Sequence, residues 1–306
     1  MSKHTHSIDS DARGESRALK IALAIVLLLV VAELIGGILS NSLALLGDAG
    51  HMFVDGLALG ISLFAITLAR KPPTTTRTFG YHRAEIMAAL INGIILVLVA
   101  AYIFYEAYQR FLSPPEVKTT LMLIVAGLGL CANLAGIFLL RKHHKRSLNV
   151  KAAFWHVLGD TISSIGVIIG GIIIAVTGWG IVDPIIAVLI GCIILWGAVR
   201  LVREASDILL EAVPRDIEVE DVIKAMKEVP GIDEIHDLHV WTITSGIIAL
   251  SSHVIIQDQM ISRTGEIVEK VNHILEGRFN ITHTTLQLEC ERCEDCPSGF
   301  ICEIKR

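Results

Sequence analysis

Long apolar runs alternate with short polar connections over the first two thirds of the chain. The run from Ile21 to Leu39 holds about 19 residues, enough for a helix to cross a hydrocarbon core about 30 Å thick. Five further runs of similar or greater length follow it, at Ser42–Ala69, Ala84–Leu112, Thr119–Leu140, Val150–Trp179 and Asp183–Val202. The pattern predicts an α-helical membrane protein with six transmembrane helices.

From Glu204 onward the pattern changes to that of a small soluble domain. Apolar residues first recur at helical spacing and then alternate on both sides of the turn residues Ser245–Gly246. The expected elements are helices at Pro214–Val229 and Ser262–Glu276 and strands at Ile235–Thr244, Ile247–Ile256 and Ile281–Leu288. This αββαβ order predicts a small α+β domain after the membrane part.

Composition and charge divide the chain in the same way. Apolar residues make up 53% of the sequence, and the net charge of −5 hides 17 basic against 11 acidic residues up to Arg203 and 9 against 20 after it. This distribution argues against a nucleic-acid-binding protein. We expect a cytoplasmic N-terminal arm at 1–18, a transmembrane domain at 19–203, a cytoplasmic α+β domain at 204–289 and a Cys-rich tail at 290–306.

Lysine and arginine residues are concentrated in alternate connections between the predicted spans. The N-terminal arm, the second-to-third connection and the fourth-to-fifth connection are basic, whereas the connections around Asn41 and Gly178–Gly180 carry no basic residue. Because basic loops stay in the cytoplasm, both termini are expected there. The compact loops favour a bacterial protein of the inner membrane.

Two predicted spans carry the same pair of ionisable residues inside the bilayer. His51 and Asp55 lie on one face of the second span, and His156 and Asp160 lie on one face of the fifth. Each such group costs about 2.5–3.5 kcal/mol at the centre of a membrane helix, so the four should face inward and find partners. Two imidazoles and two carboxylates suit tetrahedral Zn²⁺. The simpler alternative is a structural hydrogen bond within each pair.

Protons compete with a metal ion for these ligands, because imidazole binds metal only in its neutral form. We therefore hypothesise that His51 or His156 carries a counter-transported proton. Asp48 lies on the same helical face as His51 and could orient it, relay protons, or simply lie near the non-cytoplasmic surface. Glu33 in the first span could be a ligand or a buried hydrogen-bonding group.

The sequence resembles the cation diffusion facilitator family of divalent metal transporters over nearly its whole length. The matching segments are SLALLGDAGHMFVDGLALG, TFGYHRAEIMAALING, HVLGD, VDPIIAVLIG and IHDLHVWTITSG. The His, Asp, His, Asp combination is similar to that of the zinc-transporting branch. The resemblance implies a transporter and not an enzyme. It implies a homodimer that exchanges a cytoplasmic divalent cation for protons by alternating access.

Further metal ligands are implied by the same resemblance. Family positions that bind zinc in the cytoplasmic domain match His236, His253 and His283, and a loop ligand of zinc-preferring relatives matches His82. We expect this zinc to stabilise the domain or to let it sense metal.

The end of the last predicted strand suggests a separate site. His283 and Glu289 stand six residues apart, about 20 Å along a strand, so they should serve different ions. Glu289 adjoins Cys290, Cys293 and Cys296, which in a reducing compartment favour thiolate ligands over disulfides. An iron–sulfur cluster is a weaker alternative because the fourth Cys is displaced.

Two competing functions remain open on the sequence alone. One is a membrane metalloenzyme, although no HExxH motif is present and catalytic zinc usually keeps an open water position. The other is a metal sensor without transport. The ligand types also leave Co²⁺, Cd²⁺ and Ni²⁺ open beside Zn²⁺.

Overall fold

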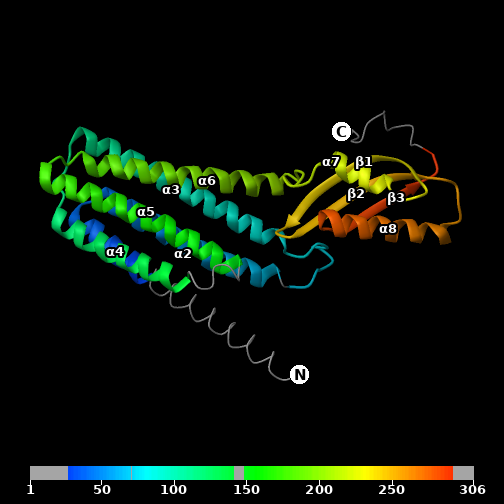
Figure 1. The fold of residues 1–306 in the computed structure, drawn as a ribbon, viewed down its shortest axis with the longest axis horizontal. Coiled ribbons are helices and arrows are strands. Elements are labelled where there is room, and N and C mark those ends of the chain that lie inside the picture. The colour runs from blue at the N-terminus through cyan, green and yellow to red at the C-terminus, as the bar shows by residue number, and fades with distance from the viewer. Residues whose placement is uncertain (1–26, 70, 141–147, 292–306) are drawn as a thin grey trace, which may run out of the picture. The chain divides into compact units, whose positions relative to one another are not determined.

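The computed structural model describes residues 27–69, 71–140 and 148–291 of the chain. The chain divides into two compact units (Figure 1). The helical unit consists of Met1–Ile61 and Ile91–Arg200, and the sheet unit consists of Ser62–Leu90 and Leu201–Arg306. Each unit is described by itself below.

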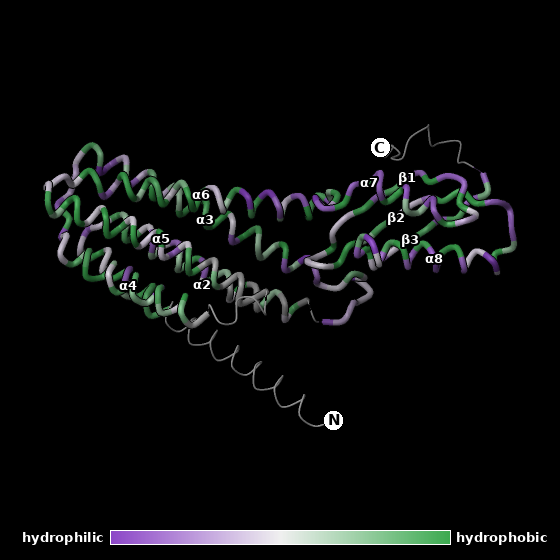
Figure 2. Tube along the Cα trace, in the orientation of Figure 1, coloured by the Kyte–Doolittle hydropathy of each residue, from purple (hydrophilic) through white to green (hydrophobic). Residues whose placement is uncertain are grey.

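Long apolar helices build the helical unit, in agreement with the runs in the sequence, and the ends of α2, α3 and α6 extend into the sheet unit. They are Leu27–Ser40, α2 (Leu43–Ala69), α3 (Arg83–Leu112), α4 (Thr119–Leu140), α5 (Leu148–Thr177) and α6 (Val182–Leu209). Within the described residues, 4 helices are long and apolar enough to cross a membrane, namely those at Arg83–Leu112, Thr119–Phe138, Val157–Thr177 and Val182–Leu209. Their hydrophobic character is visible along the trace (Figure 2). The total of six spans stays a prediction.

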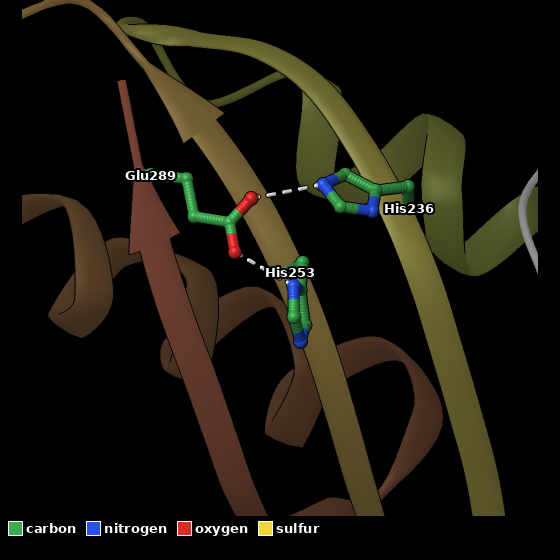
Figure 3. A group of neighbouring side chains, drawn as sticks. All are labelled: His236, His253 and Glu289. Carbon is green, nitrogen blue, oxygen red and sulfur yellow. Dashed lines mark hydrogen bonds and ion pairs between the residues drawn. The ribbon is translucent and has the colours of Figure 1, made fainter. Parts of the chain in front are cut away.

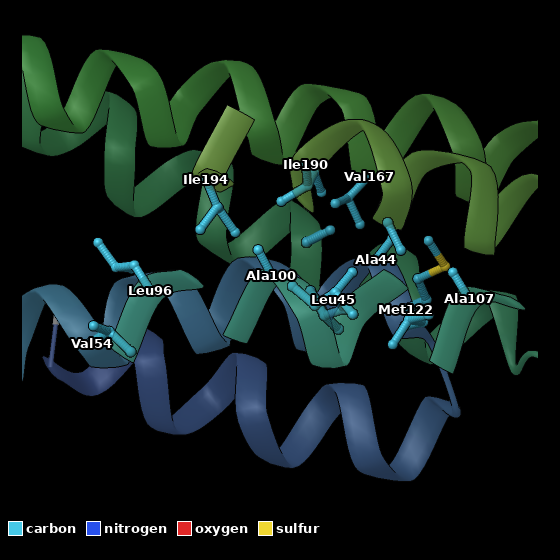
Figure 4. Close-up of a cluster of buried hydrophobic side chains, with 14 of the residues drawn as sticks. Ala44, Leu45, Val54, Leu96, Ala100, Ala107, Met122, Val167, Ile190 and Ile194 are labelled. Carbon is cyan, nitrogen blue, oxygen red and sulfur yellow. The ribbon is translucent and has the colours of Figure 1, made fainter. Parts of the chain in front are cut away.

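Small residues bring these helices close together. Ala44 and Ala100 are fully buried beside larger side chains such as Leu45 and Met122 (Figure 4). Outward-facing apolar side chains such as Leu98 remain exposed. Small residues inside and large apolar residues outside are the arrangement expected of helices packed in lipid.

A buried ionic network closes one end of the helical unit. Asp183, at the start of α6, accepts hydrogen bonds from Ser42 Oγ (2.5 Å) and from the backbone N–H groups of Leu43 (2.7 Å) and Ala44 (3.3 Å). These N–H groups begin α2 and have no partner within their own helix. Arg110 Nη1 lies 3.5 Å from Asp183 Oδ2 and donates to the Asn41 carbonyl at 2.7 Å. Asp183 therefore caps α2 from a different helix.

The sheet unit has the predicted αββαβ order. Its elements are α7 (Val219–Lys227), β1 (Ile232–Thr244), β2 (Ile247–Ile256), α8 (Ile261–Phe279) and β3 (Ile281–Glu289), and the strand order is β1-β2-β3. β1 pairs with β2 in antiparallel orientation, whereas β3 pairs with β2 in parallel after the crossover through α8. Gly246 supplies the positive φ of the tight turn between β1 and β2.

The hydrophobic core of the sheet unit lies between the sheet and its two helices. Val222 and Met226 of α7 and Val271 and Leu275 of α8 are buried against the strands. Arg278 of α8 donates two hydrogen bonds to the carboxylate of Glu228, at 2.8 and 2.6 Å. These hydrogen bonds hold the pKa of Glu228 below its ordinary value. The ion pair ties the end of α8 to the end of α7.

Candidate metal sites

The two His-xxx-Asp pairs lie on α2 and α5 in the helical unit. On α2, His51 Nε2 is 3.4 Å from Asp55 Oδ2, and the two side chains are 29% and 23% exposed. On α5, Asp160 is 2% exposed, and His156 precedes it by one helical turn. The side chain of His156 lies outside the described part of the structure, so the four-ligand set remains a prediction.

Asp48 is buried next to this face of α2. Its Oδ1 atom accepts a hydrogen bond of 2.6 Å from Ser163 Oγ of α5, three residues after Asp160. The bond joins the two helices that carry the His-xxx-Asp pairs. Ser163 was not singled out from the sequence, because an uncharged serine in an apolar helix gives no signal of its partner.

Three side chains at one end of the sheet converge on a common point (Figure 3). His236 of β1 stands opposite His253 of β2, and β3 brings Glu289 beside them. Glu289 Oε2 lies 3.1 Å from His236 Nε2, and Glu289 Oε1 lies 2.7 Å from His253 Nδ1. Among the described side chains, only these three place three ligand atoms within 4.8 Å of one another.

The chemistry of this trio fits a metal ion. His236 is fully buried, and its Nδ1 atom has no hydrogen-bond partner within the described residues. Two imidazole nitrogens and one carboxylate are typical zinc ligands and leave a fourth position for water or another donor. Asp237 adds a second carboxylate nearby, with Oδ1 3.1 Å from His239 Nε2 and Oδ2 3.8 Å from His253 Nε2.

The expected grouping of His236, His253 and His283 is not the one that the structure brings together. His283 pairs with Ala249 in the sheet, away from His253, and its ring stacks edge to face on Phe79 with centroids 5.6 Å apart. Glu289 takes its place because the parallel register sets it beside Ile255, close to His253.

Glu289 was expected to join the cysteine tail, but its two oxygens face the histidines. Cys290 is exposed, and its Sγ atom lies 4.0 Å from Asp258 Oδ1. Cys293 and Cys296 lie outside the described residues, so a thiolate site in the tail stays a prediction.

His82 lies in the connection between α2 and α3, as predicted. It lines a cavity of about 590 Å³ within the sheet unit, together with Arg77, Tyr81 and Trp241. Arg77 lies over the Tyr81 ring, 4.4 Å from its centroid. Among the described residues, His82 belongs to no group of three potential metal ligands.

Both parts of the chain match models of known protein domains. Residues 19–210 match the model of the cation efflux transmembrane domain, and residues 214–291 match that of the cation efflux protein cytoplasmic domain. The chain is 44% identical over 294 residues to the metal cation efflux system protein CzcD of Cupriavidus metallidurans, covering 96% of this chain and 92% of that protein.

Two further relatives are similar over most of their length. The cadmium, cobalt and zinc/H(+)-K(+) antiporter of Bacillus subtilis is 42% identical over 279 residues, which cover 90% of this chain and 89% of that protein. The zinc transporter ZitB of Escherichia coli is 36% identical over 304 residues, which cover 96% and 95%. A solved metal-bound C-terminal domain of the CzcD transporter is 34% identical, covers 24% of this chain and 99% of that chain, and has a TM-score of 0.22.

Proposed function

The chain belongs to the cation diffusion facilitator family of membrane metal transporters, and from this premise we propose that it exports Zn²⁺ from the cytoplasm in exchange for protons. Its relatives are named as metal efflux or zinc transport proteins, and one is named as an antiporter that uses H⁺ and K⁺. Co²⁺ and Cd²⁺ appear in the name of that antiporter and are proposed as further substrates, as is Ni²⁺ on ligand chemistry. A metalloenzyme is not favoured, because the family consists of transporters.

The observation that carries this proposal is the repeated His-xxx-Asp pair on α2 and α5. Asp160 is buried in the helical unit while His51 and Asp55 are partly exposed, so a cation held by both helices would have a buried ligand in Asp160 and an accessible pair of ligands on α2. Two carboxylates neutralise the charge of a divalent ion, which lowers the cost of placing it inside a membrane. Protonation of the imidazoles competes with metal and supports exchange for protons.

The trio of His236, His253 and Glu289 is proposed to bind a second Zn²⁺ that is not transported. Its ligands come from all three strands, so a bound ion would tie them together at one end of the sheet. Metal binding at such a site contributes directly to the stability of the folded domain. The ion would therefore stabilise the sheet unit when cytoplasmic zinc is abundant.

The family also supports an assembly and a location. The cytoplasmic-domain model that matches residues 214–291 is that of a dimerising domain, and we propose a homodimer. We further propose that both termini lie in the cytoplasm, which the basic connections support, and that the chain lies in the inner membrane, which its bacterial relatives favour.

Metal tolerance tests the role of the membrane ligands. In a zinc-sensitive cell that lacks its exporters, the unaltered chain should restore growth in zinc, whereas Asp55→Ala and Asp160→Ala should not. Asp216→Ala is the matched control, because Asp216 is exposed in the sheet unit. Membrane abundance is measured by immunoblot for each variant. Equal growth with all variants would contradict the proposed metal site.

Proton exchange is measured separately in proteoliposomes that contain a pH indicator and a zinc indicator. When a zinc gradient is imposed across a liposome membrane that contains the unaltered protein, protons should move in the direction opposite to zinc. Zinc flux without proton flux would exclude exchange, and absence of zinc flux would favour a sensor over a transporter.

A further inference from the structure

Glu33 is a buried acidic residue for which neither the metal ligands nor the packing gives a role. It lies on the helix Leu27–Ser40, its side chain is 0% exposed, and neither carboxyl oxygen has a hydrogen-bond partner within the described residues. Burying an ionised carboxylate without a donor is among the most costly arrangements in a protein. A carboxyl group in this position is therefore expected to perform a function.

The neighbouring helix leaves space for this carboxyl group. Gly129 of α4 lies directly against it, and a Cβ atom at position 129 would stand 2.5 Å from Glu33 Oε1. Real atoms do not approach so closely, so any larger residue would displace the carboxyl group. The glycine and the glutamate thus form a matched pair on two helices.

Two other carboxyl groups act electrostatically on Glu33. They are Asp48 of α2 and Asp160 of α5, and α4 contributes no charge at this point within the described residues. Ser163 donates to Asp48 Oδ1 at 2.6 Å, and no donor from the described residues reaches Asp48 Oδ2. Glu33 therefore faces negative charge whenever Asp48 and Asp160 are ionised.

We propose that Glu33 is a proton-binding site, separate from the metal ligands, that carries a counter-transported proton. This inference rests on the proposed exchange of metal for protons. Without metal, the charges of Asp48 and Asp160 and the lack of donors favour a neutral Glu33 with a proton on one oxygen. A divalent cation on Asp160 cancels the negative charge of that carboxylate, so Glu33 becomes easier to ionise and releases its proton to water.

The exchange then balances at this residue. One proton leaves Glu33 when the cation binds, and one proton from the opposite side returns to the same carboxylate after the cation has departed. Because a proton leaves when the cation binds, the charge at membrane depth changes by one unit instead of two. Coupling through Asp160 requires no contact between the proton and the metal.

Proton release on metal binding tests this proposal without transport. The full chain in detergent and weak buffer is titrated with Zn²⁺ while a pH indicator records the protons set free. Glu33→Gln should lose about one released proton per chain at zinc saturation, because the amide cannot exchange one. Glu33→Asp should retain most of the release. Glu116→Gln, the same change at an exposed position, should match the unaltered chain.

Infrared difference spectra provide a second readout that does not depend on stoichiometry. The band of a protonated carboxylic acid should decrease when Zn²⁺ binds to the unaltered chain and to Glu116→Gln. The decrease should be smaller in Glu33→Gln, and in Gly129→Ala, where the added methyl group displaces the carboxyl. Equal band loss and equal proton release in Glu33→Gln and the unaltered chain would overturn the proposal.

Measurements of zinc and proton transport distinguish a failure of this inference from a failure of the proposed function. If the unaltered chain exchanges zinc for protons in proteoliposomes and Glu33→Gln keeps the same proton-to-zinc ratio, Glu33 is not the carrier although the exchange stands. If the unaltered chain moves zinc without protons, the proposed exchange itself fails. A ratio that depends on K⁺ instead of pH would assign the site to a different cation and would also overturn the proposal.

Discussion

Asp183 should be essential for the stability of the helical unit. Asp183→Ala removes the acceptor of Ser42 Oγ and of two backbone N–H groups that begin α2, and it deprives Arg110 of a buried partner. Breaking a buried ion pair from one side costs about 3–5 kcal/mol. Arg110 keeps Glu106 at 3.1 Å and the Asn41 carbonyl at 2.7 Å, so the cost should fall near the lower end, about 3 kcal/mol.

The magnitude is measured as the free energy of unfolding of the purified chain in detergent, from denaturant titrations of the unaltered protein and the variants. Asp183→Asn keeps one acceptor oxygen but replaces the other by an amide NH₂ group, so one of the two N–H groups loses its acceptor together with the charge. This variant should cost about 2 kcal/mol. Asp207→Ala is the control on the same helix, because Asp207 forms an exposed ion pair with Arg215 at 3.0 Å.

An exposed pair of this kind contributes at most about 1 kcal/mol. The unfolding free energies should therefore decrease in the order unaltered chain, Asp207→Ala, Asp183→Asn, Asp183→Ala. Equal losses for Asp183→Ala and Asp207→Ala would refute the idea that Asp183 caps α2. A loss in Asp183→Ala that persists unchanged when Arg110 is also replaced would assign the whole effect to the cap and none to the ion pair.

Three further predictions concern the sheet unit. Met226→Ala removes a fully buried side chain and should lower the free energy of unfolding by about 2–5 kcal/mol in a denaturant titration. His236→Ala should weaken zinc binding at the trio by more than the about 10–100-fold that loss of an outer partner of a metal ligand costs, seen as loss of one step in a metal titration, whereas an equal effect of His283→Ala would contradict the grouping. Arg278 holds the pKa of Glu228 below its ordinary value, so Glu228→Gln should lower the free energy of unfolding at neutral pH. The difference from the unaltered chain should vanish as the pH falls through the lowered pKa, and a pH-independent difference would contradict this.

Local patterns were sufficient for the elements of the fold. The strand β2 has the predicted bounds, Ile247–Ile256, because a turn at Ser245–Gly246 marks its start and alternation runs to its end. The helix expected from Pro214 begins only at Val219, since residues 214–217 form a turn closed by the Ile217 N–H on the Pro214 carbonyl. Proline and acids at a helix start therefore fixed its position only to within a few residues.

Contacts between elements could not be read from spacing along the chain. His283 lies in β3 as expected, but the site depends on how β3 pairs with β2, and that register is set by packing of the whole sheet. Asp183 gave the sequence signal of a helix start for α6, whereas the structure shows it capping α2. Asp183 and Leu43 are 140 residues apart in the sequence, and no local pattern connects them.

The cap at Leu43 has a mechanical consequence for α2. The helix has 27 residues, so it is a rod about 40 Å long that is held at one end by Asp183. His51 lies about 12 Å from the held end and Ala69 about 39 Å from it. When such a rod tilts about its held end, the ligand moves only about a third as far as the opposite end. The far end of α2 can therefore move by several ångströms while His51 shifts by about a third of that distance.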